Sequence, residues 1–106
     1  MARPQIQERS AYQKTFHVKD DDGNLVMPSN LRYRIDCVTS QSPVLGWVVV
    51  TAASSVPISV SSELNLIVND ANDVETKRIT VQANYGLPGQ IVGVHEYDVL
   101  NSRFYA

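Results

Sequence analysis

The chain has 106 residues, a formal net charge of -2 at pH 7, 43% hydrophobic residues and one cysteine. This length suits a single domain with its own core, and a lone Cys37 excludes an internal disulfide framework. The slightly negative net charge argues against a nucleic-acid partner, because binding to phosphates requires clustered Lys and Arg. The longest apolar region, 44–60, is interrupted by Ser54, Ser55 and Pro57, so we do not expect it to span a membrane.

The first ten residues are mostly polar and surround a single large apolar side chain, Ile6. Because such a segment has too little apolar surface to fold alone, we interpret residues 1–10 as an N-terminal arm and residues 11–106 as the domain. The arm is either a frayed terminus or an extension that orders against a neighbouring subunit. In the second case Arg3, Ile6 and Arg9 are candidate interface residues.

From Tyr12 the apolar residues recur with period two, which indicates a strand with Tyr12, Phe16 and Val18 on one face. The acidic segment 20–24 that follows predicts a turn, because its Gly23 accepts positive φ and its carboxylates are readily solvated.

The clearest strand pattern covers residues 31–39. Apolar or large residues alternate with charged ones, so that one face carries Leu31, Tyr33, Ile35 and Cys37. The next apolar run, 44–50, is continuous, which is typical of a strand covered on both faces. We therefore expect Trp47 to anchor the core.

Three further strands are predicted in the second half of the chain. They lie around Ile58 and Val60, over residues 75–84, and over residues 90–100 with Tyr97 and Val99 facing inward. The segment 85–89 reads as the turn of a hairpin. Residues 62–70 fit either a strand or one to two helical turns capped by Ser62, and we favour a short helical turn near 62–69.

Val, Ile and Thr together account for 26 residues, and their branching at Cβ favours strands. About seven strands separated by turn signals indicate an all-β protein with a single antiparallel sandwich. A Cys followed by a Trp on the next strand is typical of immunoglobulin-like domains, but no second Cys occurs near Val81. The expected architecture is therefore immunoglobulin-like, of the disulfide-free fibronectin type III kind.

Candidate catalytic or metal-binding groups are sparse in the sequence. The acidic turn 20–24 lacks the Gly and Glu positions of an EF-hand, which leaves a solvated turn or a site shared with Asp70 or Asp73. The soft-metal ligand types, His17, His95 and Cys37, are isolated from one another. We find no nucleophile elbow and no phosphate-binding glycine loop. We expect no enzyme, no cofactor and no resident metal.

Two surface features suggest contacts. A modest basic patch is expected on the strand faces, formed by Arg32, Arg34, Lys77 and Arg78. We interpret it as a solvated face whose charges pair with Asp36 and Glu75; the alternative is a nucleic-acid site. The aromatic pair Phe104 and Tyr105 near the C-terminus either folds back on the core or fills a groove on a neighbour. In the second case both are candidate interface residues.

The segments YQKTFHVKDDDGNLVMPSNLRYRIDC, ETKRITVQANYGLPGQ and HEYDVLNSRF resemble a group of small virion proteins of tailed bacteriophages. The resemblance covers most of residues 10–104. The shared features are the N-terminal arm, the acidic turn, the strand Tyr33–Cys37, Trp47 on the next strand, Glu75–Arg78 at the start of a strand, and the ending with Tyr97, Val99 and Asn101.

The resemblance implies a non-enzymatic accessory protein of the virion, assembled in the cytoplasm of the host bacterium. It would decorate or cement a capsid or serve at the head–tail junction, with capsid, portal or tail proteins as partners and a homo-oligomer as a further possibility. The alternative is a fibronectin-like module that binds a ligand or carbohydrate. Such a module needs exposed aromatic residues clustered together, whereas Tyr12, Tyr85 and Tyr97 are scattered by strand phase.

Overall fold

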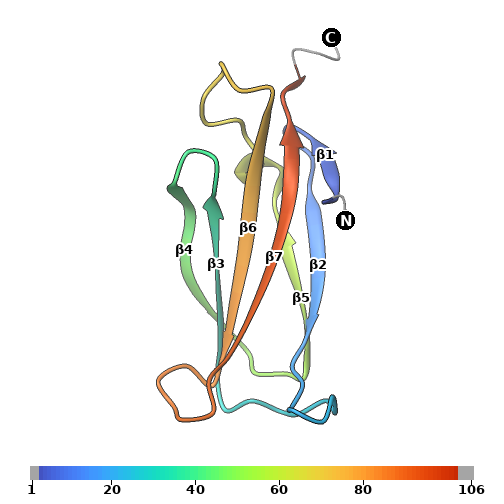
Figure 1. Ribbon diagram of the computed structural model, residues 1–106, viewed down its shortest axis with the longest axis vertical. Helices are drawn as coiled ribbons and strands as arrows, with labels where there is room; N and C mark the ends of the chain where they lie inside the picture. The colour runs from blue at the N-terminus through green and yellow to red at the C-terminus, as the bar shows by residue number, and fades with distance from the viewer. Residues whose placement is uncertain (1–2, 103–106) are drawn as a thin grey trace.

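The computed structural model describes residues 3–102. Within them the chain forms seven strands and one short 3₁₀ helix (Figure 1). In chain order these are β1 (Gln5–Gln7), β2 (Tyr12–His17), β3 (Leu31–Cys37), β4 (Ser42–Val50), β5 (Ser55–Val60), the helix η1 (Ser62–Leu64), β6 (Val74–Ala83) and β7 (Ile91–Leu100).

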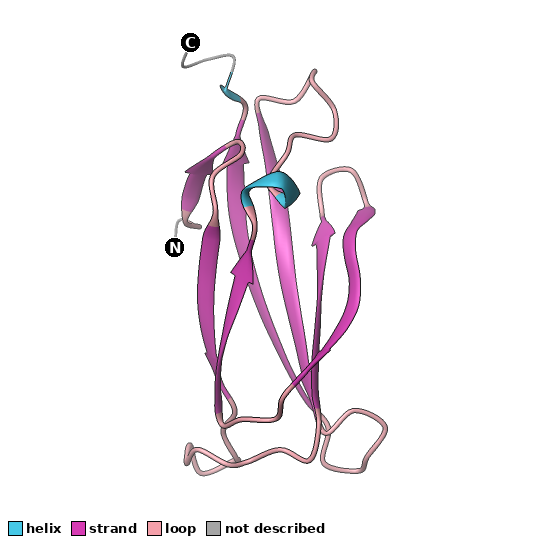
Figure 2. Cartoon of the chain, turned by 180° about the vertical axis from the view of Figure 1, so that it is seen from behind, coloured by secondary structure: helices cyan, strands magenta, loops and turns pink. Residues whose placement is uncertain are grey.

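The strands form two sheets. A five-stranded sheet has the order β1-β7-β6-β3-β4, and a two-stranded sheet pairs β2 with β5. The larger sheet lies in front in Figure 1, and the smaller one in front in Figure 2, so that the two form a sandwich. In immunoglobulin-like domains, strands B and E lie in one sheet and strands C, F and G in the other. Here β2 and β5 correspond to the first set, and β3, β6 and β7 to the second. The predicted all-β sandwich is confirmed.

One strand pairing departs from the predicted antiparallel arrangement. β1 pairs with β7 in parallel, with Ile6 opposite Val99, and the described sheet is therefore mixed. The chain leaves β1 through Arg9, which has a φ of 68°, and crosses to β2 in the other sheet. Residues 5–7 of the segment interpreted as an arm thus form a strand on their own chain.

The core lies between the two sheets and follows the predicted alternation closely. Leu31, Ile35 and Cys37 are buried as expected, and so are Tyr97 and Val99. The other buried hydrophobic residues come from both sheets: Val18, Val56, Ile58, Val60, Ile79, Val81 and Ala83.

The expectation that Trp47 anchors the core is wrong, and so is the expectation that its strand is covered on both faces. β4 is an edge strand of the larger sheet, and the Trp47 side chain is 37% exposed. Tyr33 pairs with Val48 but Ile35 pairs with Leu45, so β4 carries an extra residue at this point. This irregularity reverses the phase of the strand and turns Trp47 to the outer face.

Two local predictions are confirmed with changed detail. The segment 20–24 forms a turn in which Gly23 has a φ of 84°. The favoured helical turn is present as η1 only over Ser62–Leu64, and the N-cap is Ser61 rather than the predicted Ser62. The rest of the segment to β6 is loop, visible next to the short helix in Figure 2.

Candidate protein-interaction surface

The outer face of the larger sheet carries several exposed apolar side chains near the β6–β7 loop, at the lower end of Figure 1. Val49 of β4 is 69% exposed, and Val92 and Val94 of β7 are 51% and 55% exposed. Strand register places Arg32 between Val49 and Gln82, with Val92 beyond Gln82. We call this surface the Arg32 face; it consists of Arg32, Trp47, Val49, Gln82, Tyr85, Val92 and Val94.

The centre of the Arg32 face is a guanidinium group held between two aromatic rings. Arg32 Cζ lies 4.2 Å from the centre of the Trp47 ring and 4.3 Å from that of Tyr85. Arg32 Nε donates a hydrogen bond of 2.8 Å to Gln82 Oε1. Arg34 approaches the same Trp47 ring at 5.4 Å. Cation–π stacking on two sides and the hydrogen bond fix the orientation of the Arg32 side chain.

Tyr85 is held in place by two asparagines, although it lies in a loop. Asn84 follows β6 with a φ of 55°, a left-handed conformation that Asn tolerates better than most residues. Asn30 brackets the next residue, because its Oδ1 accepts from Tyr85 N at 2.8 Å and its Nδ2 donates to Tyr85 O at 3.2 Å. Asn84 Oδ1 in turn accepts from Ser29 N at 2.7 Å. These bonds join the β2–β3 and β6–β7 loops and position the Tyr85 ring on Arg32.

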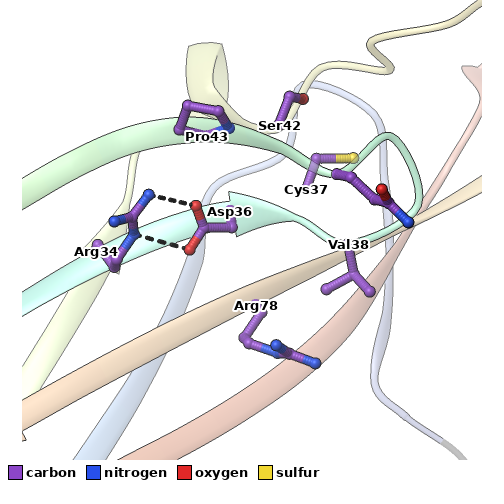
Figure 3. A pocket seen from close by; sticks show the side chains of 8 residues that line it. Arg34, Asp36, Cys37, Val38, Ser42, Pro43 and Arg78 are labelled. Atoms are coloured by element: carbon purple, nitrogen blue, oxygen red, sulfur yellow. Dashed lines mark hydrogen bonds and ion pairs between the residues drawn. The ribbon is translucent and has the colours of Figure 1, made fainter.

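A hollow of about 370 Å³ with polar and apolar lining lies at the opposite end of the same outer face, next to the β3–β4 turn. Figure 3 shows Arg34 directed at Asp36, and the two side chains form hydrogen bonds of 2.7 and 2.9 Å. Arg78, on the other side of the hollow, makes bonds of 2.6 and 2.9 Å to Glu96. Since each guanidinium already has a carboxylate, the hollow offers no unpaired arginine to a ligand.

Lys77 is not on the surface, so its assignment to the basic patch is wrong. Its side chain is 1% exposed and that of Glu75 is 0% exposed, with 3.5 Å between Lys77 Nζ and Glu75 Oε1. The strand alternation that buries Ile79 continues through both residues. The predicted outward position holds for Arg32, Arg34 and Arg78, which lie on the outer face and are partly exposed.

Glu75 anchors the loop before β6. Its carboxylate accepts hydrogen bonds from Val68 N at 2.6 Å, Asn69 N at 2.9 Å and Asn72 Nδ2 at 3.0 Å. Burial alone would raise the pKa of Glu75, but these three bonds and the nearby Lys77 outweigh it, so the pKa is lowered from its ordinary value. The Cys37 thiol lies 3.8 Å from Glu75 Oε1. Cys37 is therefore buried as predicted, beside a charged group.

A stack of rings joins the two sheets. Tyr12 of β2 stacks on Tyr97 of β7 at 4.2 Å between ring centres, and its hydroxyl lies 2.6 Å from His95 Nε2. Burial lowers the pKa of His95, and the charge of Lys14 lowers it further. The hydroxyl of Tyr97 donates a hydrogen bond of 2.6 Å to Asn65 Oδ1 in the interior. These contacts stabilise the sandwich by tying β2 to β7.

The predicted interface residues of the N-terminus contact their own chain. Arg3 Nε lies 3.0 Å from Asp98 Oδ1, and Ile6 packs against the core. The Arg9 side chain is exposed, while its backbone N–H donates a hydrogen bond of 2.7 Å to Asn65 O. Phe104 and Tyr105 lie outside the described residues.

The Asp20 side chain closes the acidic turn. Asp20 Oδ1 accepts from the backbone N–H of Asp22 at 2.9 Å and of Asn24 at 3.0 Å. Within residues 3–102 no group of three or more His, Cys, Asp or Glu side chains is arranged to hold a metal ion. In the same range no helix is long and apolar enough to cross a membrane.

The fold and the Arg32 face define an all-β sandwich with immunoglobulin-like strand order and an exposed patch of aromatic, apolar and arginine side chains. No protein-family model, curated protein or solved structure matches the chain.

Proposed function

We propose that the protein is a non-enzymatic structural component of a bacteriophage virion, where it binds other virion proteins as a capsid decoration or cement subunit or as a head–tail accessory. The resemblance of residues 10–104 to small virion proteins of tailed phages motivates the assignment to a virion. The observation that carries the binding role is the Arg32 face, an exposed patch on a self-contained sandwich.

The composition of the Arg32 face supports a protein partner. Trp, Tyr and Arg are the residue types that contribute most often to binding energy in protein interfaces. Here Trp47 and Tyr85 each contact Arg32 at the centre of the patch. The exposed valines around them supply apolar area that a partner would cover, since single exposed apolar residues are common but a group on one sheet face is not.

Mass spectrometry of purified phage particles tests the virion assignment. We expect the protein in the particle at a constant ratio to the major capsid protein, before and after a high-salt wash, while host proteins decrease with washing. Its absence from the particle, or a ratio that falls in parallel with host proteins, would overturn the assignment.

A second candidate function is the ligand- or carbohydrate-binding module. One observation favours it, because Trp47 and Tyr85 gather at one end of the outer face even though they are distant in the sequence. However, one side of each ring lies on Arg32, so stacking of a sugar would have to use the other side. Binding to immobilised cell-surface polysaccharides, with Trp47→Ala as the comparison, tests this function; equal retention of both proteins contradicts it.

A further inference from the structure

We infer that Arg32 is the binding position for a carboxylate of the partner protein, which is an Asp or Glu side chain flanked by apolar residues. This inference rests on the proposed function, because it names the chemistry of the partner that the Arg32 face binds in the virion.

The guanidinium of Arg32 retains unused hydrogen-bond donors. Within residues 3–102 the guanidinium makes one hydrogen bond, from Nε to Gln82, and two ring stacks. Both terminal nitrogens, Nη1 and Nη2, therefore keep their N–H groups available. A guanidinium with two free terminal nitrogens matches the two oxygens of a carboxylate.

The partners of Arg32 also differ from those of three other arginines, of which two lie on the same sheet and one, Arg3, precedes β1. Arg34 is paired with Asp36 and Arg78 with Glu96, each with a shortest contact of 2.7 Å or less. Arg3 is paired with Asp98 at 3.0 Å. Arg32 differs from these three in having two aromatic rings and an amide as partners, and within residues 3–102 its guanidinium has no carboxylate partner.

The Arg32 side chain is already ordered before any partner binds. The rings of Trp47 and Tyr85 hold the guanidinium from two sides, and Tyr85 is itself fixed by Asn30. A partner carboxylate would therefore not have to order a flexible arginine on binding, which removes one of the entropic costs of association.

The surroundings favour a protein carboxylate over the phosphates of a nucleic acid and over the outer face of a second copy of this chain. Val49, Val92 and Val94 are apolar and would not bind the charged backbone of a nucleic acid. On the outer face of a second copy, the nearby carboxylates Asp36 and Glu96 are already bound by arginines. The partner surface that fits is a single acidic side chain within an apolar patch on a different virion protein.

The first experiment compares particles assembled with wild-type protein, with Arg32→Gln and with Arg78→Gln, all produced from a phage that lacks the endogenous gene. Arg78 is a matched control because it lies on the same sheet face but already has Glu96 as its partner. We expect Arg32→Gln to be incorporated about tenfold less than wild type and Arg78→Gln to be incorporated normally. Thermal unfolding of both variants verifies that they are folded.

The outcomes separate the two proposals. Equal incorporation of Arg32→Gln and wild type, or equal losses of Arg32→Gln and Arg78→Gln, would overturn the role of Arg32 and leave the virion assignment intact. Absence of the wild-type protein from the particle would overturn the virion assignment and, with it, this inference.

A second experiment tests the chemistry of the partner with Arg32→Lys. The new amine keeps the charge, and a carbodiimide can join it to a carboxylate in contact. An amide bond forms between the two side chains, and the carbodiimide takes up the water that they lose and leaves as a urea. We expect a cross-link from position 32 to an Asp or Glu of another virion protein. Links from position 32 only to this chain or its second copy, or no link from this position in particles that contain the variant, would overturn the inference.

Discussion

The buried carboxylate of Glu75 provides a sharp test of the energetics of this fold. Replacing Glu75 by Gln removes a negative charge that accepts bonds from Val68 N, Asn69 N and Asn72 Nδ2 and that faces buried Lys77. The substitution leaves the Lys77 ammonium in the interior without a counter-charge. It also replaces one carboxylate oxygen, which accepts hydrogen bonds, with an NH₂ group that cannot accept them from the neighbouring N–H donors. Breaking a buried ion pair in this way costs about 3–5 kcal/mol, a large part of the roughly 5–15 kcal/mol that stabilises a domain.

The matched variant is Lys77→Met, which is of similar length and apolar. Glu75 then keeps its three N–H donors, so the remaining carboxylate is still satisfied by hydrogen bonds. We expect this change to cost less than about 2 kcal/mol. Urea unfolding at neutral pH, analysed at constant m-value, measures both free energies. Equal destabilisation by Lys77→Met and Glu75→Gln would refute the dominant role assigned to the Glu75 carboxylate.

Three further predictions concern the rings of the sandwich. Stability should decrease as the pH falls through 6.5, because the pKa of His95 is lowered in the folded state and the unfolded chain binds the proton first; His95→Gln should remove this part of the pH profile of urea unfolding, and an unchanged profile contradicts the assignment. Tyr97→Phe should cost about 1–3 kcal/mol, because Asn65 Oδ1 loses its 2.6 Å donor in the interior; a stability equal to wild type in thermal unfolding would show that the bond contributes nothing. The fluorescence of Trp47, the single tryptophan, should be quenched by acrylamide in the native state, since the side chain is 37% exposed; protection typical of a core tryptophan would contradict its outward position.

The parts of the fold that could be predicted are those that depend on local alternation. The apolar residues of β3 are separated by even numbers of positions, and this spacing alone places them on one face of the strand: Leu31, Ile35 and Cys37. The same rule places Tyr97 and Val99 in the core. Turns were equally local, since the acidic segment 20–24 carries the residue types that turns favour.

The position of Trp47 could not be predicted from alternation, because two non-local facts decide it. β4 lies at the edge of the sheet, and the irregular pairing opposite Tyr33 and Ile35 reverses the strand phase before Trp47. A continuous apolar run carries information on neither point. Gly46, which precedes Trp47 in the run, was the available signal for a bulge.

The buried pair of Glu75 and Lys77 was missed for a different reason. The period-two pattern that places Ile79 inward, continued toward the start of β6, also places Lys77 and Glu75 inward. The charge of the two side chains led to the opposite interpretation, although burial of such a pair is possible when hydrogen bonds satisfy it.

The Arg32 face depended on contacts that no local pattern contains. Arg32 and Gln82 are 50 residues apart in the sequence, and Tyr85 lies three residues further along in a loop. Only the pairing of β3 with β6, and the bonds from Asn30 to Tyr85, bring these side chains together. The sequence pattern identified Arg32 as a surface residue, but not its aromatic neighbours.

The most direct test of the central claim, that the Arg32 face binds another virion protein, is a cryo-electron microscopy reconstruction of the intact particle at side-chain resolution. We expect density for the sandwich with Arg32, Trp47 and Tyr85 against a different virion protein, and with an Asp or Glu of that protein at the Arg32 guanidinium. A particle in which this face of the sandwich is exposed to solvent would contradict the claim.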